Sequence, residues 1–344
     1  MNIQKSLFGR MNDKDIYRFN LVNAKGNSIS IINYGAAVIS WKVKDKNERT
    51  RDIVIGFDNL EDYLKNDAYI GCIAGRYANR IADGRFTVQG TEFKLACNNG
   101  PNHLHGGITG FDKVAWDAKT VDDVNPRLSF TYYSKDGEEG YPGNLSVKVD
   151  YIYTDNDELI IEYFAQTDKA TPVNLTSHGY FNLTGDADRS ILDHSLQIHA
   201  DYYTAVNENQ IPTGELCAVD KTAFDFNMPA KISGQISKTE NGFDHNYVLK
   251  HDGNKLSLAV VLTDPENELQ LSVYTTEPGL QFYSGNLLDG SITNRDGKPV
   301  SKHAALCLET QHFPDSPNRP EFPSTILLPG DAFTSATIYK ISVN

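Results

Sequence analysis

The chain has 344 residues, of which 40% are apolar and 22% charged, a balance typical of a soluble globular protein rather than a disordered or fibrous one. Asp and Glu outnumber Lys and Arg by 45 to 32, and the net charge of -13 disfavours binding to nucleic acid or anionic lipid. No stretch approaches the roughly 18 apolar residues that cross a bilayer, and the N-terminus lacks the apolar core of a secretory signal. We therefore expect a cytoplasmic protein, or a periplasmic or secreted one if an export signal has been removed.

Short β-strands separated by turns make up most of the predicted structure. A helix is expected at 60–65, and no segment keeps a helical period for more than about two turns. The segment 145–153 alternates apolar with mostly polar residues, and similar β-rich runs cover 127–133, 158–166, 256–263 and 269–275. Asp-Gly and Asn-Gly pairs, which favour tight hairpin turns, recur at 83–84, 99–100, 136–137, 241–242, 252–253, 289–290 and 296–297. Strands without alternating helices predict an all-β fold, a large antiparallel β-sandwich.

The chain is predicted to form a single domain over 1–344, because no Gly/Ser linker or change of composition divides it. Four prolines near the C-terminus should form a stiff, irregular loop, since proline cannot serve a central strand: Pro314, Pro317, Pro320 and Pro323. The cysteines are widely spaced without a C-x-x-C pair, so we expect them to be reduced and mostly buried: Cys72, Cys97, Cys217 and Cys307.

Polar residues gather in five segments together with Gly, Asn or Pro, a composition typical of loops that carry sites on a rigid scaffold: 75–86, 102–107, 174–183, 242–249 and 308–318. The chain has neither a G-x-S-x-G elbow nor a G-x-x-x-x-G-K-[ST] loop, so acyl and phosphoryl transfer are not supported. The His, Glu, Asp, Arg and amide side chains that remain suit the hydroxyls of a sugar. The residues alone indicate a polyol-binding or carbohydrate-processing β protein.

Considered one at a time, several candidate residues could have a purely structural role instead of a function. His178 stands in a half-buried strand pattern, which slightly favours a core histidine. Glu309 ends a buried apolar run, and a carboxylate there is expensive to bury without a partner, which favours a function. Arg80 fits a surface ion pair equally well, and Asp244 fits a turn better.

In order along the chain, these segments closely resemble the aldose 1-epimerases, also called galactose mutarotases. The resemblance covers nearly the whole chain, through NYGAAVISWKV at 33–43, ANRI, NHLHGG, GFDKVAW at 110–116, DGEEGYPG at 136–143, NLTSHGYFNL, PGLQFYSGN at 278–286 and LETQHFPDSPN. It implies the galactose mutarotase-like supersandwich, an antiparallel β-sandwich with the sugar in an open cleft. It also implies a catalytic base at Glu309 and an acid at His178, with sugar contacts from Asn79, Arg80, His105, Tyr180, Asp244 and Gln281.

The implied reaction interconverts the α and β anomers of free hexoses such as D-galactose and D-glucose. A base removes the proton of the C1 hydroxyl while an acid protonates the ring oxygen, and the open aldehyde rotates about C1–C2 before the ring closes again. With ordinary pKa values of about 4.3 and 6.5, Glu309 should start ionised and His178 should act as a proton donor. The implied partner is a monosaccharide, bound by a monomer or a homodimer.

This chemistry requires no organic cofactor and no metal. His103 and His105 would share one face of a strand, a spacing that metal sites also use, but the sequence offers no third ligand nearby. A structural or sugar-binding role is therefore favoured for both. A bound cation such as calcium would be compatible with the reaction, although nothing in the sequence indicates one.

Three other functions compete with this one. A hexose 6-phosphate epimerase would need a cationic cluster, and only Arg80 stands out among the matched segments. A glycosidase would need two carboxylates flanking a glycosidic bond, for which Asp244 and Glu309 are the candidates, and it would leave His178 unused. A non-catalytic sugar-binding protein has no use for both His178 and Glu309.

Overall fold

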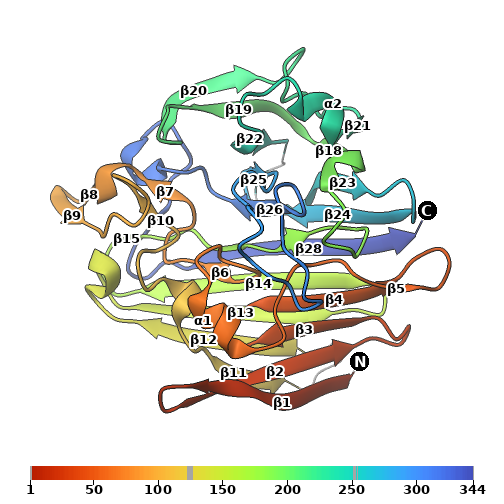
Figure 1. Ribbon diagram of the computed structural model, residues 1–344. Coiled ribbons are helices and arrows are strands. Elements are labelled where there is room, and N and C mark those ends of the chain that lie inside the picture. Colours follow the sequence, from red (N-terminus) through yellow and green to blue (C-terminus); the bar gives the residue numbers. More distant parts are fainter. Residues whose placement is uncertain (1, 122–126, 251–252, 254, 344) are drawn as a thin grey trace.

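The structure is a computed structural model that describes residues 2–121, 127–250, 253 and 255–343 (Figure 1). The N-terminal part forms a five-stranded antiparallel sheet in chain order: β1 (Asn2–Met11), β2 (Lys14–Val22), β3 (Ser28–Ile32), β4 (Val38–Lys44) and β5 (Thr50–Asp52). Adjacent strands join through short turns, so each strand pairs with the one that follows it.

A nine-stranded antiparallel sheet spans the molecule in the order β11-β12-β13-β14-β28-β24-β23-β18-β21. The C-terminal strand lies in its middle, between β14 and β24, and so joins the two halves of the sheet. Its strands are β11 (Asp117–Val121), β12 (Arg127–Ser134), β13 (Leu145–Tyr153), β14 (Glu158–Thr167), β18 (Ser195–Ile198), β21 (Ala230–Lys231), β23 (Ser257–Thr263), β24 (Leu269–Thr275) and β28 (Phe333–Val343).

A six-stranded antiparallel sheet, in the order β17-β26-β25-β22-β19-β20, carries most of the polar segments. Its strands are β17 (Tyr180–Phe181), β19 (Ala200–Val206), β20 (Pro212–Ala218), β22 (Asp244–Leu249), β25 (Gly279–Tyr283) and β26 (Leu306–Gln311). Short strand pairs complete the fold: β6 (Ile73–Ala74) with β16 (Thr176–Ser177), β7 (Arg80–Ile81) with β10 (His103–Leu104), β8 (Arg85–Val88) with β9 (Thr91–Lys94), and β15 (Thr171–Pro172) with β27 (Ile326–Leu327).

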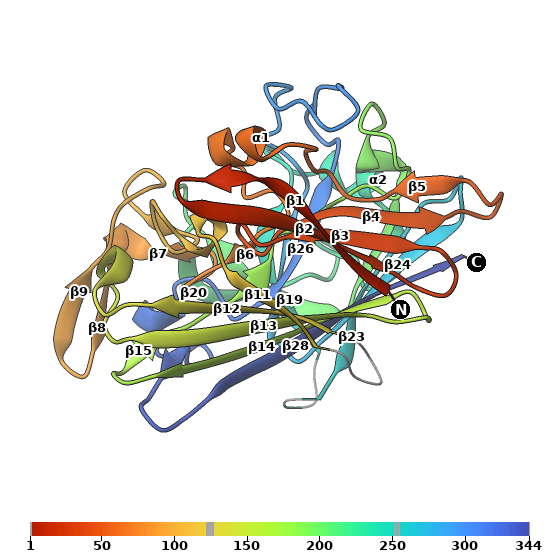
Figure 2. The same ribbon diagram turned by 90° about the horizontal axis from the view of Figure 1, so that it is seen from below.

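The nine-stranded sheet forms one layer, against which the other two large sheets pack. Phe19 of β2 meets Phe130 of β12 edge to face, with ring centroids 6.0 Å apart. Phe181 of β17 stacks on Tyr339 of β28 at 5.5 Å. Figure 2 shows the red N-terminal strands on one side of this core and the yellow-green strands on the other. Burying each such aromatic side chain contributes about 1.5–3 kcal/mol to folding, so the core that joins the layers is one of the main sources of stability.

Helices are few and short: α1 (Leu60–Lys65), α2 (Ile232–Ile236), and 3-10 turns at Ala82–Gly84, Phe111–Lys113, Glu138–Gly140, Ile191–Asp193 and Ser316–Asn318. The helix expected at 60–65 is confirmed. Asn59 caps it by accepting a hydrogen bond from the Asp62 backbone N–H at 2.9 Å, and Leu60 and Tyr63 bury its apolar side. Within the described residues, no helix has the length and apolar character needed to cross a bilayer.

The predicted all-β sandwich is confirmed, and all five predicted strand segments form strands, β12, β13, β14, β23 and β24. The proline-rich segment is the irregular loop expected, broken only by the turn at Ser316–Asn318. The cysteines are all free, but the expectation that most are buried is wrong, because Cys97 is exposed and Cys217 half-buried.

The hairpin prediction is correct about backbone conformation but wrong about position. The glycines of all seven pairs have positive φ, from +57° at Gly84 to +85° at Gly290, although Asp252 itself lies outside the described residues. Among the described residues, none of these pairs forms a two-residue turn between two named strands. Gln89 and Gly90 do so between β8 and β9. Left-handed positions serve the longer loops just as well, so the dipeptide signal marks a bend without specifying a hairpin.

Candidate active site

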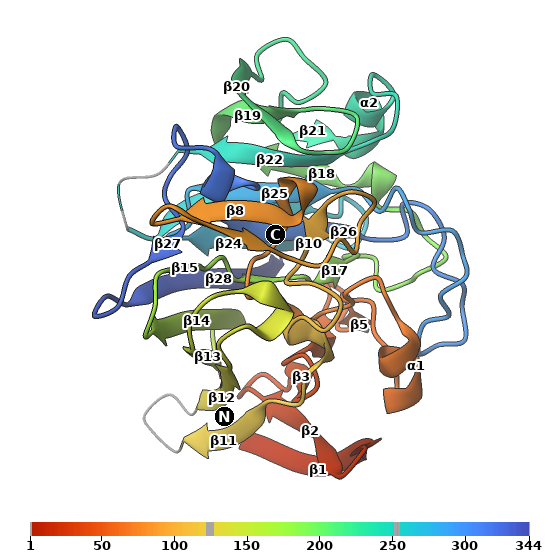
Figure 3. The ribbon, with the colours of Figure 1, turned by 90° about the vertical axis from the view of Figure 1, so that its left-hand side faces the viewer.

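A cleft of about 650 Å³ opens beside the six-stranded sheet. Seven of the eight predicted site residues line it, namely Asn79, Arg80, His105, His178, Tyr180, Asp244 and Glu309. The β7–β10 pair supplies the facing wall (β10 in Figure 3), and Arg80 of β7 lies 3.5 Å from Asp244 of β22. Gln281 is the exception, since it is buried and does not line the cleft.

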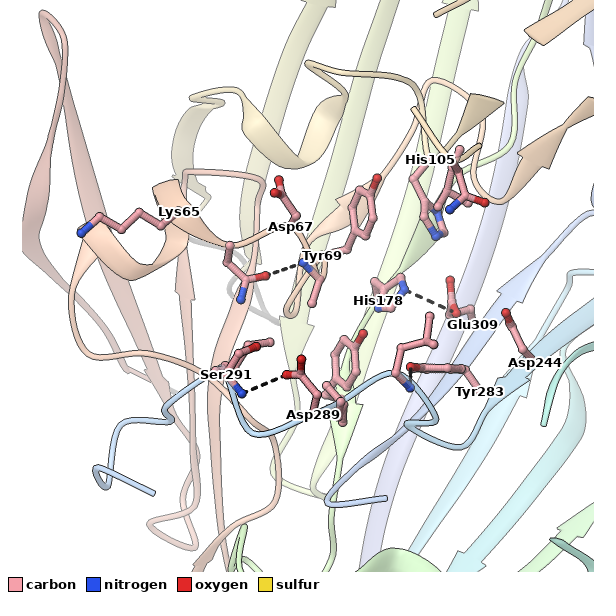
Figure 4. Close-up of a pocket in the computed structure, with 18 of the residues that line it drawn as sticks. Lys65, Asp67, Tyr69, His105, His178, Asp244, Tyr283, Asp289, Ser291 and Glu309 are labelled. Carbon is pink, nitrogen blue, oxygen red and sulfur yellow. Dashed lines mark hydrogen bonds and ion pairs between the residues drawn. The ribbon is translucent and has the colours of Figure 1, made fainter. Parts of the chain in front are cut away.

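Strand register brings the proposed base and acid together. Tyr180 of β17 pairs with Cys307 of β26, and His178 lies two residues before Tyr180 while Glu309 lies two residues after Cys307. Because the strands run antiparallel and side chains alternate, extending this register places His178 opposite Glu309 on the same face. Nε2 of His178 lies 3.7 Å from Oε1 of Glu309 (Figure 4).

The same face continues across β25 and β22. Gln281 pairs with Glu309, and Asp244 pairs with Tyr283. The side-chain amide of Gln281 donates a hydrogen bond to Oδ1 of Asp244 at 2.6 Å, while a guanidinium nitrogen of Arg80 lies 3.5 Å from Oδ2. Gln281 and Arg80 thus fix the Asp244 carboxylate from two sides. Gln281 acts on the site indirectly, by orienting this carboxylate.

The opposite wall comes from the β7–β10 pair and the residues next to it. The backbone N–H of Asn79 donates to Nδ1 of His105 at 3.1 Å, and Oδ1 of Asn79 accepts from the backbone N–H of Arg80 at 2.9 Å. Gly106 must be glycine, because a Cβ there would lie 1.8 Å from the Gly75 carbonyl oxygen. The chain therefore turns tightly after His105 and leaves its ring facing the cleft.

Burial controls the protonation states in the cleft. Burial raises the pKa of Glu309 well above its usual value, the negative charge of Asp244 raises it further, and Arg80 opposes both. Burial lowers the pKa of His178 to about 4 and that of His105 well below its usual value. At neutral pH both imidazoles are neutral, so His178 donates through an N–H rather than as an imidazolium. The expectation of an ordinary carboxyl pKa at Glu309 is wrong, because that value applies to a solvated carboxyl.

Residues 17–340 match the protein family described as aldose 1-epimerase. The chain belongs to the aldose 1-epimerase family. It is 46% identical to galactose mutarotase from Bos taurus over 92% of this chain and 91% of the relative. It is 38% identical to aldose 1-epimerase from Escherichia coli strain K12 over 93% of each chain.

Solved structures agree with this family assignment. A galactose 1-epimerase from Lactobacillus acidophilus superposes with a TM-score of 0.88 at 28% identity, covering 100% of this chain and 99% of the other. An aldose epimerase homologue from C. elegans has the same TM-score and identity, covering 94% and 98%.

Three side chains in the epimerase cleft have the donor types of a metal site. Ligand atoms of His105, His178 and Glu309 lie within 4.8 Å of one another. The hydrogen bond from Asn79 to Nδ1, however, requires the neutral His105 to carry its proton on Nε2, the nitrogen that a metal would need. Metal-binding histidines instead donate their remote N–H to an acceptor. The His105 environment thus fits a donor to a sugar hydroxyl better than a metal ligand.

His103 proves separate from this site. It is completely buried, with Nε2 2.7 Å from the Tyr141 hydroxyl and Nδ1 2.7 Å from the Ala96 carbonyl oxygen. The expected shared face with His105 is wrong, because β10 ends at Leu104 and His105 adopts a φ of +50°. The structural role for His103 follows from its satisfied ring.

Sequence reasoning missed two residues that lie against His178, namely Tyr69 and Cys307. The ring of Tyr69 lies 4.6 Å from that of His105 and 5.9 Å from that of His178, between centroids, and Tyr69 lines the cleft. Nothing in its surrounding loop sequence marks it. Cys307 contacts Nδ1 of His178 with its sulfur. Its position two residues before Glu309 on one strand was a usable signal, since such residues share a face.

Proposed function

We propose that the protein is an aldose 1-epimerase that interconverts the α and β anomers of a free aldose such as galactose. The observation that carries this proposal is the His178–Glu309 pair, an imidazole and a carboxylate 3.7 Å apart in one cleft. Relatives described as galactose mutarotase and aldose 1-epimerase support it along nearly the whole chain.

Ring opening needs one proton removed and another supplied. Ionised Glu309 takes the proton of the C1 hydroxyl, and Nε2–H of neutral His178 passes its proton to the ring oxygen as the C1–O5 bond breaks, so the negative charge moves from Glu309 to an imidazolate at His178. After rotation about C1–C2, the protonated Glu309 returns its proton to the carbonyl oxygen as the ring closes, and His178 regains its own from the O5 hydroxyl. The raised pKa of Glu309 makes its ionised form a stronger base than a solvated carboxylate.

The remaining cleft residues are proposed to hold the sugar. Asn79, Arg80 and His105 from one wall and Asp244 from the other offer donors and an acceptor to hydroxyl groups. Tyr180 lies beside His178, with ring centroids 5.1 Å apart, and narrows the floor. Gln281 orients Asp244. All the atoms of the reaction come from the sugar and these side chains, so we propose that no cofactor takes part.

Charge in the cleft favours a neutral sugar over a sugar phosphate. Carboxylates on its lining come from Asp62, Asp67, Asp244, Asp289 and Glu309. The cations on the same lining are Lys65, whose Nζ lies 2.6 Å from Oε1 of Glu61, and Arg80, which faces Asp244. A phosphate would meet more repulsion than attraction, which disfavours the hexose 6-phosphate alternative.

Polarimetry of freshly dissolved α-D-galactose tests this function. The protein should accelerate the approach to the anomeric equilibrium beyond the buffer rate, and Glu309→Gln should slow it on the order of a hundredfold to ten-thousandfold while sugar binding persists. Glucose, xylose, arabinose and galactose 6-phosphate, run in parallel, rank the substrates. Binding of galactose without acceleration by the unmodified protein would instead identify a sugar-binding protein, and unchanged activity in the variant would remove Glu309 from the reaction.

A further inference from the structure

We propose that Cys307 is a positioning residue whose thiol holds His178 in the tautomer that presents Nε2–H to the cleft. This inference rests on the proposed function, in which that proton goes to the sugar ring oxygen. Cys307 touches no part of the cleft itself, since the lining residue next to it on β26 is Glu309.

The contact follows from strand pairing. Tyr180 and Cys307 are partners in the β17–β26 register, and His178 lies two residues from Tyr180 on the same face. Sγ of Cys307 lies 3.6 Å from Nδ1 of His178, a normal distance for a sulfur hydrogen bond. The two ring nitrogens of His178 thus have different neighbours, sulfur at Nδ1 and the Glu309 carboxyl at Nε2.

The thiol has a proton to give. Cys307 has no exposed surface, and burial raises its pKa well above the usual value, so the group is a neutral S–H at physiological pH. Nδ1 of His178 lies within hydrogen-bond reach of this sulfur, so the S–H can donate to it.

The tautomer decides whether His178 can act as an acid. A neutral imidazole carries one N–H, and its other nitrogen is an acceptor. With the proton on Nδ1, the Nε2 lone pair would face Glu309 and the sugar, and nothing would be donated to the ring oxygen. With S–H donating to Nδ1, the proton stays on Nε2. A hydrogen bond at the remote nitrogen commonly sets the tautomer of a functional histidine in this way.

His105 provides an internal comparison. Its Nδ1 accepts from a backbone N–H, that of Asn79, which no side-chain substitution removes. The neighbour of Nδ1 in His178 is instead a side chain, so substitution at Cys307 removes the contact at that nitrogen and leaves the Glu309 contact at Nε2 in place.

Long-range ¹H–¹⁵N NMR of protein labelled in its histidines reads the tautomer without any turnover. In the unmodified protein at pH 7, we expect His178 to show a protonated Nε2 and an unprotonated Nδ1. Cys307→Val should shift its two ¹⁵N signals toward the other tautomer or toward a mixture, and Cys307→Ser, which keeps a donor, should shift them less. A protonated Nδ1 in the unmodified protein would overturn the proposal even if neither variant folded.

Polarimetry supplies the second readout. Cys307→Val should lower kcat about tenfold or more and leave KM within about twofold, because it disturbs the acid His178 and leaves the sugar contacts intact. Cys307→Ser should recover part of the lost kcat. Cys72→Ser is the matched control: Cys72 is also buried and accepts from the His178 backbone N–H through its carbonyl, which the substitution keeps. Equal kcat in Cys307→Val and the unmodified protein, or equal losses in the Cys72 and Cys307 variants, would contradict the proposal. If the unmodified protein shows the Nε2–H tautomer but no mutarotation, the proposed function fails and the tautomer assignment stands.

Discussion

Gln281 donates a 2.6 Å hydrogen bond from its side-chain amide nitrogen to Oδ1 of Asp244, and this bond couples two strands of the site. Gln281 in turn stands opposite Glu309 across the β25–β26 ladder. The negative charge of Asp244 is therefore fixed in place near the proposed base, where it raises the pKa of Glu309. Asp244 thus combines a proposed sugar contact with an electrostatic effect on the pKa of the proposed base.

Asp244→Asn should move the pH profile of the enzyme. Removal of a like charge lowers the pKa of Glu309, so the fall of kcat/KM on the acid side should occur at lower pH than in the unmodified protein. KM should rise at the same time, because a charged acceptor for a sugar hydroxyl becomes a neutral amide. The measurement is polarimetric kcat/KM between pH 4 and 9. The control is Asp201→Asn, because Asp201 does not line the cleft and pairs with Lys250. An acid limb that stays in place or moves to higher pH would contradict the role given to Asp244.

Glu309→Gln should make the protein more stable at neutral pH while it loses activity. The pKa of Glu309 is higher in the folded than in the unfolded chain, so the folded state binds more protons and its stability falls as pH rises from the unfolded pKa, about 4.3, through the raised folded value. The neutral amide of Glu309→Gln does not ionise, so the variant does not lose this stability as the pH rises. Thermal unfolding should show a higher Tm for the variant at pH 8, with the difference shrinking toward pH 4. Each pKa unit corresponds to about 1.4 kcal/mol, an upper value for a carboxyl that a cleft partly hydrates. If the Tm of both proteins depended on pH in the same way, burial would not raise the pKa of Glu309 in the folded protein.

Chelation should leave the reaction unchanged. The Asn79 N–H directs the His105 proton to Nε2, which argues against a resident metal at the site. After dialysis against EDTA, the polarimetric rate with galactose should agree with that of untreated protein within about twofold, and added Zn²⁺ or Ca²⁺ should not increase it. A loss of rate that one of these ions restores would contradict this prediction and require a metal in the mechanism.

Arg76→Met should destabilise the fold around the site. Arg76 is 2% exposed, and its guanidinium donates to the carbonyl oxygens of Pro142 and Gly143 at 2.9 and 3.0 Å and to the Ser134 hydroxyl at 2.6 Å. The substitution leaves these buried acceptors unpaired, at a cost on the order of 3 kcal/mol. Urea unfolding followed by fluorescence measures the loss.

The exposed Arg85 provides the control for this substitution, and Arg85→Met should change the stability by less than about 0.5 kcal/mol. Similar midpoints for the Arg76 and Arg85 variants would mean that the buried hydrogen bonds of Arg76 contribute little.

Local patterns in the sequence were sufficient for the fold class and for most of the wall of the site. Alternation in 145–153 predicts a strand because successive side chains point to opposite faces, and β13 has the predicted bounds. The family motifs led to Glu309, His178 and five of the six proposed sugar contacts on one cleft. Turn dipeptides such as Asp136-Gly137 were less informative, since a positive φ serves a long loop as well as a hairpin.

Only the tertiary structure decided how these residues act on one another. Alternation assigns a side chain to a face but not to a partner, so the pairing of Tyr180 with Cys307, and with it the approach of His178 to Glu309, required the assembled sheet. Desolvation depends on everything packed around a group, which is why the low pKa of His178 and the raised pKa of Glu309 are absent from any local pattern. Tyr69 reaches His105 from a loop distant in sequence, a contact that depends on the path of the whole chain.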